Sequence, residues 1–166
     1  SEYNHRYRAA NVADGRIPGP LTRDDVGQAW CVKGNEHEGG VTLTFQWPQP
    51  VSVATILYYG RTSFTLGETW KDYELYVGDA QQPAVKSQFK VGHGPQAIHL
   101  PAPQSTAKLT LKFLTCHGGP NPGASEIQVF AARPDGAALG QFLPPSKIPG
   151  DDEYAPPPPV NESPEL

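Results

Sequence analysis

The sequence predicts an all-β protein, an antiparallel β-sandwich or jelly roll. Apolar residues fall in short runs that turn-forming residues separate. No series of apolar residues has the spacing of an amphipathic helix. The 166 residues include 17 glycines and 19 prolines and no methionine. About eight short strands separated by polar turns can form a core when each of two sheets covers the apolar face of the other.

The expected strands are short segments, several of which have one apolar face. Alternation at every second residue is clearest in Val41/Leu43/Phe45 and in Tyr73/Leu75/Val77. In chain order the expected strands are Val41–Gln46, Val51–Tyr59, Lys71–Val77, Lys86–Val91, Gln96–Leu100, Lys108–Leu114 and Glu126–Ala131. At 166 residues the chain suits one domain of ordinary size plus some unstructured sequence.

The end of the chain has a different composition. From Phe142 onward, acidic residues and prolines replace the strand patterns, and the prolines include the run from Pro156 to Pro159. Proline lacks a backbone donor and favours the extended polyproline II form. We therefore expect a folded module over residues 1–141 and a proline-rich linker or tail over residues 142–166. A ligand for a partner's aromatic groove is the less favoured interpretation of this tail.

Charge and composition disfavour several classes of function. The net charge is −4 with 13 lysines and arginines and no basic block, so a nucleic-acid surface is not expected. No apolar run approaches the roughly 20 residues of a membrane-spanning helix. The histidines show neither metal-ligand nor general-base spacing, and no nucleophile motif is present, so we expect no enzyme activity.

The two cysteines, Cys31 and Cys116, lie far apart in the chain. Their spacing fits no zinc motif. They form either one long-range disulfide, which is the favoured interpretation, or two small buried thiols.

A succession of segments resembles the discoidin family, also called the coagulation factor V/VIII type C domains. An Asp14-Gly15 turn precedes Trp30, and strand-like segments follow with the order and spacing of that family over residues 9–131. The matching segments are Ala9–Gly15, Ala29–Trp30, Val51–Arg61, Lys71–Val77 and Gly123–Phe130. The resemblance implies a galactose-binding-like jelly roll, closest in look to the bacterial carbohydrate-binding modules with this fold.

The resemblance also implies a structural calcium site. Asp14 and Glu126 match the positions whose carboxylates bind the ion in similar modules. Backbone carbonyls of Asn11, Arg16 and Ser125, with the carbonyl and hydroxyl of Thr22, would complete the shell. Together these groups give the number of oxygen ligands that calcium takes, which is about six to eight.

The ligand of similar modules lies on loops at one end of the sandwich. Here these are an early loop (Cys31–Gly40), a central loop (Gly60–Trp70) and a late loop (Cys116–Ala124). Candidate ligand-binding residues are the aromatic and planar polar ones, because sugars need a flat aromatic face and paired hydrogen bonds. They are Tyr59, Arg61, Phe64, Trp70, His37, His117 and Asn121. The alternative is that Tyr59 and Trp70 cap the core and that Arg61 pairs with Glu68.

The leading hypothesis for function is a non-catalytic carbohydrate-binding module, with a galactose-type glycan as ligand and linked domains of a larger protein as partners. A secreted, periplasmic or cell-surface location accompanies the resemblance. Two alternatives stay open: a discoidin domain that contacts protein or lipid, and an architectural domain without a ligand of its own. The fold alone does not decide between these functions.

Overall fold

The computed structural model describes residues 2–20, 22, 25–34, 38–61, 63–136 and 139–147. Over these ranges the chain forms strands and short 3-10 helices, without an α-helix, which confirms the all-β prediction. Accordingly, no helix in these ranges is long and apolar enough to span a membrane. The elements are η1 (Ala9–Ala13), β1 (Trp30–Cys31), β2 (Val41–Tyr59), η3 (Ser63–Glu68), β3 (Asp72–Val77), β4 (Val85–Gln88), β5 (Pro95–Phe113), β6 (Gly123–Ala124), β7 (Glu126–Phe130) and η5 (Pro145–Lys147).

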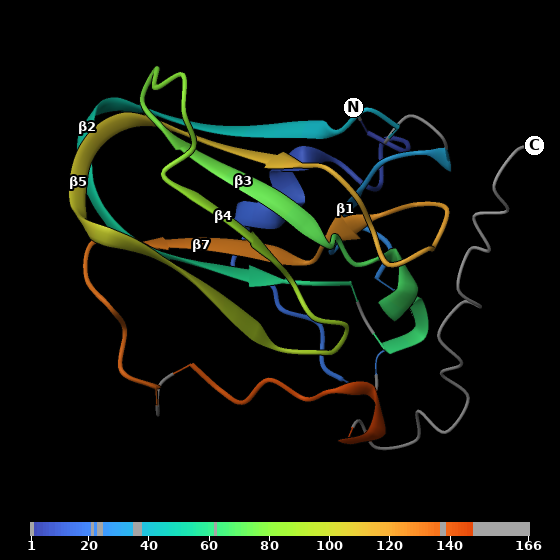
Figure 1. Ribbon diagram of the computed structural model, residues 1–166. Helices are drawn as coiled ribbons and strands as arrows, with labels where there is room; N and C mark the ends of the chain where they lie inside the picture. Colours follow the sequence, from blue (N-terminus) through green and yellow to red (C-terminus); the bar gives the residue numbers. More distant parts are fainter. Residues whose placement is uncertain are drawn as a thin grey trace, which may run out of the picture.

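Two long strands, β2 and β5, join the two layers of the sandwich. They pair antiparallel along their length in a sheet of order β4-β3-β5-β2-β7. Figure 1 shows the β2–β5 ribbon curving around one end of the molecule, so that its two halves lie in different layers. One layer holds β3 and β4, and the other holds β7. We call the curved end the closed end and the opposite end the open end.

The continuity of β2 and β5 differs from the sequence prediction, which divided each into two strands. Prolines suggested turns there, namely Pro48 and Pro50 in β2 and Pro101 and Pro103 in β5. All four are exposed and lie in the curved part, where the pairing register shifts between Gln46 and Val51 and again between Val53 and Thr55, opposite Pro101 and Pro103. Proline is tolerated at such irregularities because its missing N–H need not enter the ladder.

The core between the layers is rich in aromatic side chains. Trp70 is fully buried and stacks on Phe113, with ring centroids 4.9 Å apart. The ring centroids of Trp30 and Trp70 are 6.0 Å apart. The hydroxyl of Tyr58 donates to the Gly123 carbonyl oxygen at 2.9 Å and accepts from the Trp70 amide at 3.1 Å. This cluster supports the segments that form the open end.

The chain after β7 returns to the sandwich through the first residues of the predicted tail. Leu143 and His93 exchange both backbone hydrogen bonds, at 2.7 and 2.8 Å. A Cβ atom at Gly92 would lie 2.5 Å from the Leu143 carbonyl oxygen, so the two backbones are in close contact. The boundary between residues 141 and 142 stays a prediction, and residues 148–166 of the predicted tail lie outside the described part.

Candidate functional site

The early, central and late loops meet at the open end, as expected. Cys31 of β1 pairs with Gly123 of β6, and Thr69 and Trp70 form bridges to Gly123 and Cys116. In Figure 1 this end carries β1 and η3, opposite the closed end. Segments that are distant in the sequence therefore form one surface.

Two glycines permit the close approach of these loops. A Cβ atom at Gly123 would lie 1.9 Å from the Trp30 carbonyl oxygen, and one at Gly119 would lie 2.2 Å from Glu68 Cγ. Both distances are far below contact distance, so any larger residue would push β1 or Glu68 away. The absence of a side chain at Gly119 thus positions Glu68.

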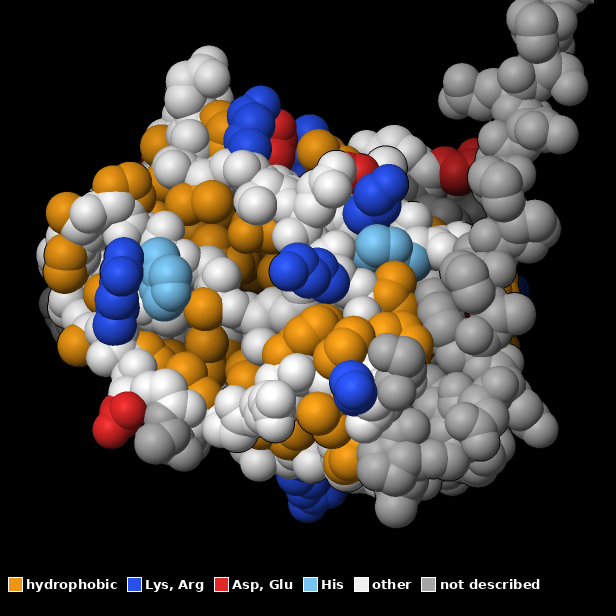
Figure 2. Space-filling view, turned by 60° about the horizontal axis from the view of Figure 1, so that its bottom comes forward, with side chains coloured by type: hydrophobic (Ala, Val, Ile, Leu, Met, Phe, Trp, Pro, Cys, Tyr) orange, Lys and Arg blue, Asp and Glu red, His pale blue; other side chains and the backbone are white. Residues whose placement is uncertain are grey.

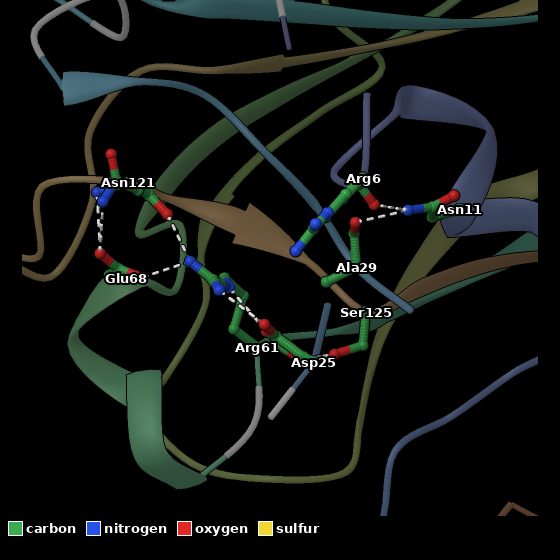
Figure 3. Close-up of polar contacts among 9 residues, drawn as sticks. Arg6, Asn11, Asp25, Ala29, Arg61, Glu68, Asn121 and Ser125 are labelled. Carbon is green, nitrogen blue, oxygen red and sulfur yellow. Dashed lines mark hydrogen bonds and ion pairs between the residues drawn. The ribbon is translucent and has the colours of Figure 1, made fainter. Parts of the chain in front are cut away.

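Arg61 is the centre of a buried ion-pair network at this end (Figure 3). Its Nε and Nη2 donate to the two carboxylate oxygens of Asp25 at 2.8 and 2.7 Å. Its Nη1 donates to Glu68 and, at 3.0 Å, to the Asn121 carbonyl oxygen. Only 4% of Arg61 and 3% of Asp25 are exposed. Burial tends to lower the pKa of Arg61, but hydrogen bonds and charges, first from Asp25 and then from Glu68, raise it, so the guanidinium stays charged.

Asn121 connects all three loops. Its backbone amide and side-chain Nδ2 donate to Glu68 Oε1 at 3.0 and 3.2 Å. Its Oδ1 accepts from the Gly34 amide at 3.0 Å. The polar groups of the open end are therefore fixed in place before any ligand arrives.

A pocket of about 150 Å³ lies over this network. It is lined by Tyr3, Tyr7, Cys31, Arg61, Glu68 and Asn121. Tyr3 is 39% exposed, and its amide donates to the Cys31 carbonyl oxygen at 2.7 Å. The Tyr3 and Tyr7 rings meet edge to face, 5.8 Å apart, and Arg61 Cζ lies 5.2 Å from the Tyr7 centroid. The pocket thus combines aromatic rings with fixed polar groups.

The predicted ligand-binding residues divide into two groups. Arg61 and Asn121 line the pocket. Trp70 does not, because it is buried in the aromatic core, and Tyr59 is buried beside β7, where it pairs with Glu126. His117 is half-buried and its Nε2 donates to the Phe89 carbonyl oxygen at 2.9 Å.

Two further predicted residues cannot be placed. His37 and the side chain of Phe64 lie outside the described part of the chain. Tyr3, Tyr7 and Asp25 were not predicted as site residues, because all three lie before the first expected strand and belong to no periodic pattern. A tyrosine pair just before the family-like segment was the one available signal.

The two cysteines are free thiols, so the disulfide favoured from the sequence is absent and the alternative holds. Cys31 is buried and lines the pocket, and Cys116 is half-buried with its thiol donating to the Gly119 carbonyl oxygen at 3.5 Å. Hydrogen bonds and ion pairs, rather than a covalent link, connect the early and late loops.

The two carboxylates of the predicted calcium site lie close together. Glu126 is 3% exposed, and its Oε2 has no hydrogen-bond partner among the described residues. Its pKa is raised from 4.5 to about 7, first by burial and then by the charge of Asp14, while hydrogen bonds from the Gly15 and Asp14 amides oppose the rise. A buried acceptor without a partner next to a second carboxylate is a place where a cation fits.

The other predicted calcium ligands have mixed surroundings. Asn11 and Ser125 are buried with occupied side chains: Asn11 Nδ2 donates to the Arg6 and Ala29 carbonyls, and Ser125 Oγ donates to Gly60. Arg16 is exposed and its amide donates to Asp14 Oδ1 at 2.9 Å. The Thr22 amide donates to the Gly19 carbonyl at 3.0 Å. No group of three or more His, Cys, Asp or Glu within the described ranges could hold a metal, so backbone oxygens would have to contribute.

Comparisons with known proteins identify the fold. No protein-family model matches the chain, and no curated protein matches it. The family 32 carbohydrate-binding module of Clostridium perfringens NanJ, solved with galactose, is similar with a TM-score of 0.62 and 17% identity over 78% of this chain and 88% of that module. An F5/8 type C domain from Bacteroides fragilis has a TM-score of 0.58 and 17% identity over 78% of this chain and 84% of that domain.

A third similar structure is the family 32 module of AlyQ, solved with 4,5-unsaturated mannuronic acid. Its TM-score is 0.56 at 11% identity, and the match covers 75% of this chain and 86% of that module. At such low identities the likeness establishes the fold alone. The chain has the β-sandwich of family 32 modules and F5/8 type C domains, as the sequence resemblance predicted.

Proposed function

We propose that the chain is a non-catalytic carbohydrate-binding module whose ligand occupies the open-end pocket. The observation that carries this proposal is the convergence of an exposed tyrosine, Tyr3, with the fixed polar network of Arg61, Glu68 and Asn121 around one pocket. Aromatic rings pack against the C–H face of a sugar ring, and planar polar groups recognise its hydroxyls. The similar structures include modules solved with sugars, which supports the same class of ligand here.

The polar groups of the pocket suit hydroxyl ligands. Arg61 has five N–H donors, and its hydrogen bonds to the described residues use four of them and leave one on Nη2. Glu68 accepts three hydrogen bonds of the about four that a carboxylate can accept. A sugar hydroxyl both donates and accepts, so it can use both remaining positions. A galactose-type sugar is the favoured ligand.

We also propose that calcium binds between Asp14 and Glu126. The buried Glu126 Oε2, which has no hydrogen-bond partner within the described ranges, supports this site. Carbonyls of Asn11, Arg16 and Ser125, with Thr22, would supply further oxygens. Bound calcium would supply positive charge that offsets the two carboxylates. We propose a structural role for the ion, because its ligand Ser125 is itself bonded to the end of β2. The Ser125 amide donates to the Tyr59 carbonyl at 2.9 Å, and its hydroxyl donates to the adjacent Gly60 carbonyl at 2.7 Å.

The proposed context is a larger secreted, periplasmic or cell-surface protein that the module directs to glycans through linked domains. On the face shown in Figure 2, Lys and Arg side chains are scattered rather than gathered into a patch. This distribution favours a neutral glycan over nucleic acid or anionic lipid as partner.

A glycan-array screen followed by calorimetric titration tests the proposal. Tyr3→Ala should weaken binding of the best glycan tenfold or more, because it removes the exposed ring of the pocket, while the melting temperature changes little. Tyr76→Ala is the matched control, since Tyr76 is a half-buried tyrosine on β3 outside the pocket, and its affinity should stay within about twofold. A folded wild type that binds no glycan would overturn the proposal.

A further inference from the structure

The charges of the pocket lining and of Asp25 do not balance. Arg61 contributes one positive charge, and the carboxylates of Asp25 and Glu68 both pair with it. Glu68 lines the pocket itself, and the remaining lining residues are Tyr3, Tyr7, Cys31 and Asn121. The described lining together with the Asp25 carboxylate therefore carries one excess negative charge.

The guanidinium also lacks a free edge for an anion. Arginine recognises a carboxylate best through two parallel N–H donors. Asp25 occupies the edge formed by Nε and Nη2, and Glu68 and the Asn121 carbonyl occupy Nη1 (Figure 3). One N–H on Nη2 is left, which suits a hydroxyl but not a paired contact with a ligand carboxylate.

We infer that this pocket selects neutral sugars and rejects sugars that carry a carboxylate, an inference that rests on the proposed carbohydrate-binding function. A carboxylate only accepts hydrogen bonds, whereas the free position on Glu68 needs a donor. A carboxylate ligand would therefore meet like charge from Glu68 and Asp25 without a compensating ion pair. A neutral sugar meets neither penalty.

The ionisation of pocket residues agrees with this electrostatic picture. The pKa of Tyr7 is raised to about 12, first by burial and next by the charge of Asp25, which ranks above the opposing effect of Arg61. Asp25 also hydrogen-bonds the Tyr7 side chain. A negative charge on the Tyr7 ring is thus disfavoured chiefly by burial and next by Asp25.

Matched pairs of sugars test the inference. We would titrate the methyl glycosides of galactose, glucose and mannose against the corresponding uronates at low ionic strength. The wild type should bind at least one neutral sugar, and that sugar at least tenfold more tightly than its uronate. Raising the salt concentration should narrow this ratio by strengthening uronate binding alone, because salt screens repulsion between charges.

Charge-neutral variants identify the residue responsible. Glu68→Gln retains an amide oxygen as acceptor and removes one charge, so it should narrow the ratio at least threefold. Asp79→Asn is the matched control, because it removes one charge from an 89% exposed side chain outside the pocket, and it should leave the ratio unchanged. If Glu68→Gln does not fold, Asp25→Asn and the salt series on the wild type provide the same test.

The outcomes separate the two proposals. If a neutral sugar binds and its uronate binds equally well or better, the charge selection is overturned and the carbohydrate-binding function stands. If no sugar of either kind binds to folded protein and the array is also blank, both proposals fail. An unchanged ratio in Glu68→Gln and at high salt would also overturn the inference.

Discussion

The two ends of the sandwich are built in different ways. At the closed end, β2 and β5 continue through the bend, paired to each other by backbone hydrogen bonds, with exposed prolines and the half-buried rings of Phe45 and Trp47 stacked 6.4 Å apart. At the open end, short strands and loops converge on the buried charges of Arg61, Asp25 and Glu68. Backbone pairing between two long strands forms one end, and polar side-chain contacts between loops form the other. The end with preorganised polar groups is the one suited to recognition.

The largest expected effect comes from unpairing the charges of the open end. Arg61→Ala would leave Asp25 and Glu68 buried without their cation and should reduce the free energy of unfolding by about 3–5 kcal/mol. Lys108→Ala breaks an ion pair with Asp79, whose side chain is 89% exposed, so solvent screens the pair and its loss should change the free energy of unfolding far less. Urea denaturation of both variants measures the difference. Equal losses would mean that the buried network does not hold the open end together.

A second prediction concerns the sign of the pH dependence at Glu126. Its pKa in the folded chain is raised to about 7, so the folded state holds this proton more tightly than the unfolded state. The contribution of Glu126 to the free energy of unfolding is fully present below about pH 4.5. It is lost as the pH rises to about 7, and the loss amounts to at most about 3 kcal/mol. Asp79 behaves in the opposite way: Lys108 lowers its pKa, so its contribution is lost on acidification.

Glu126→Gln separates this effect from the other carboxylates. In metal-free protein at pH 8 the variant should be more stable than the wild type, whereas at pH 4 the two should be similar. Calcium should reverse the order at pH 8, because the ion binds the wild-type carboxylate and stabilises the folded state by mass action. Denaturation with calcium or chelator measures the reversal. The same order in both solutions would contradict the calcium site.

The sequence predicted the strands within the sheets better than it predicted either end of the sandwich. Alternation in Val41/Leu43/Phe45 predicts a strand because side-chain direction depends only on neighbouring residues. The prolines at 48 and 50 hid the continuity of β2, because an exposed bend tolerates residues that usually mark turns. At the open end, the late loop was predicted to meet the other two, but Asp25 comes from a segment without a periodic pattern. No local signal states that its carboxylate lies beside Arg61.

The aromatic residues illustrate the same limit. Trp70 and Tyr3 are both large rings near the open end, yet one is fully buried and the other is 39% exposed. The sequence left open whether Trp70, at the end of the central loop, faces a ligand or caps the core. Its burial depends on packing against Phe113, a residue distant in the chain. Only the assembled sandwich distinguishes a core ring from a pocket ring.

The smallest expected effect lies at the closed end. Trp47→Ala removes a half-buried ring that packs against the core and Phe45, so it should cost about 1–2 kcal/mol of stability. Because Trp47 is distant from the pocket residues, glycan affinity should stay within about twofold. Thermal unfolding together with calorimetric titration checks both values. A large loss of glycan affinity in this variant would place the binding site at the closed end and contradict binding in the open-end pocket.

Amide chemical shifts in NMR directly test whether a sugar binds in the open-end pocket. The isotope-labelled chain would be titrated with the glycan selected by the array, and perturbed backbone resonances would be located on the fold. If the sugar binds in the pocket, the largest shifts should occur at Tyr3, Tyr7, Cys31, Arg61 and Asn121, and the closed end around Trp47 should be unchanged. Shifts centred on the closed end, or on the outer face of β3 and β4, would contradict binding in the pocket.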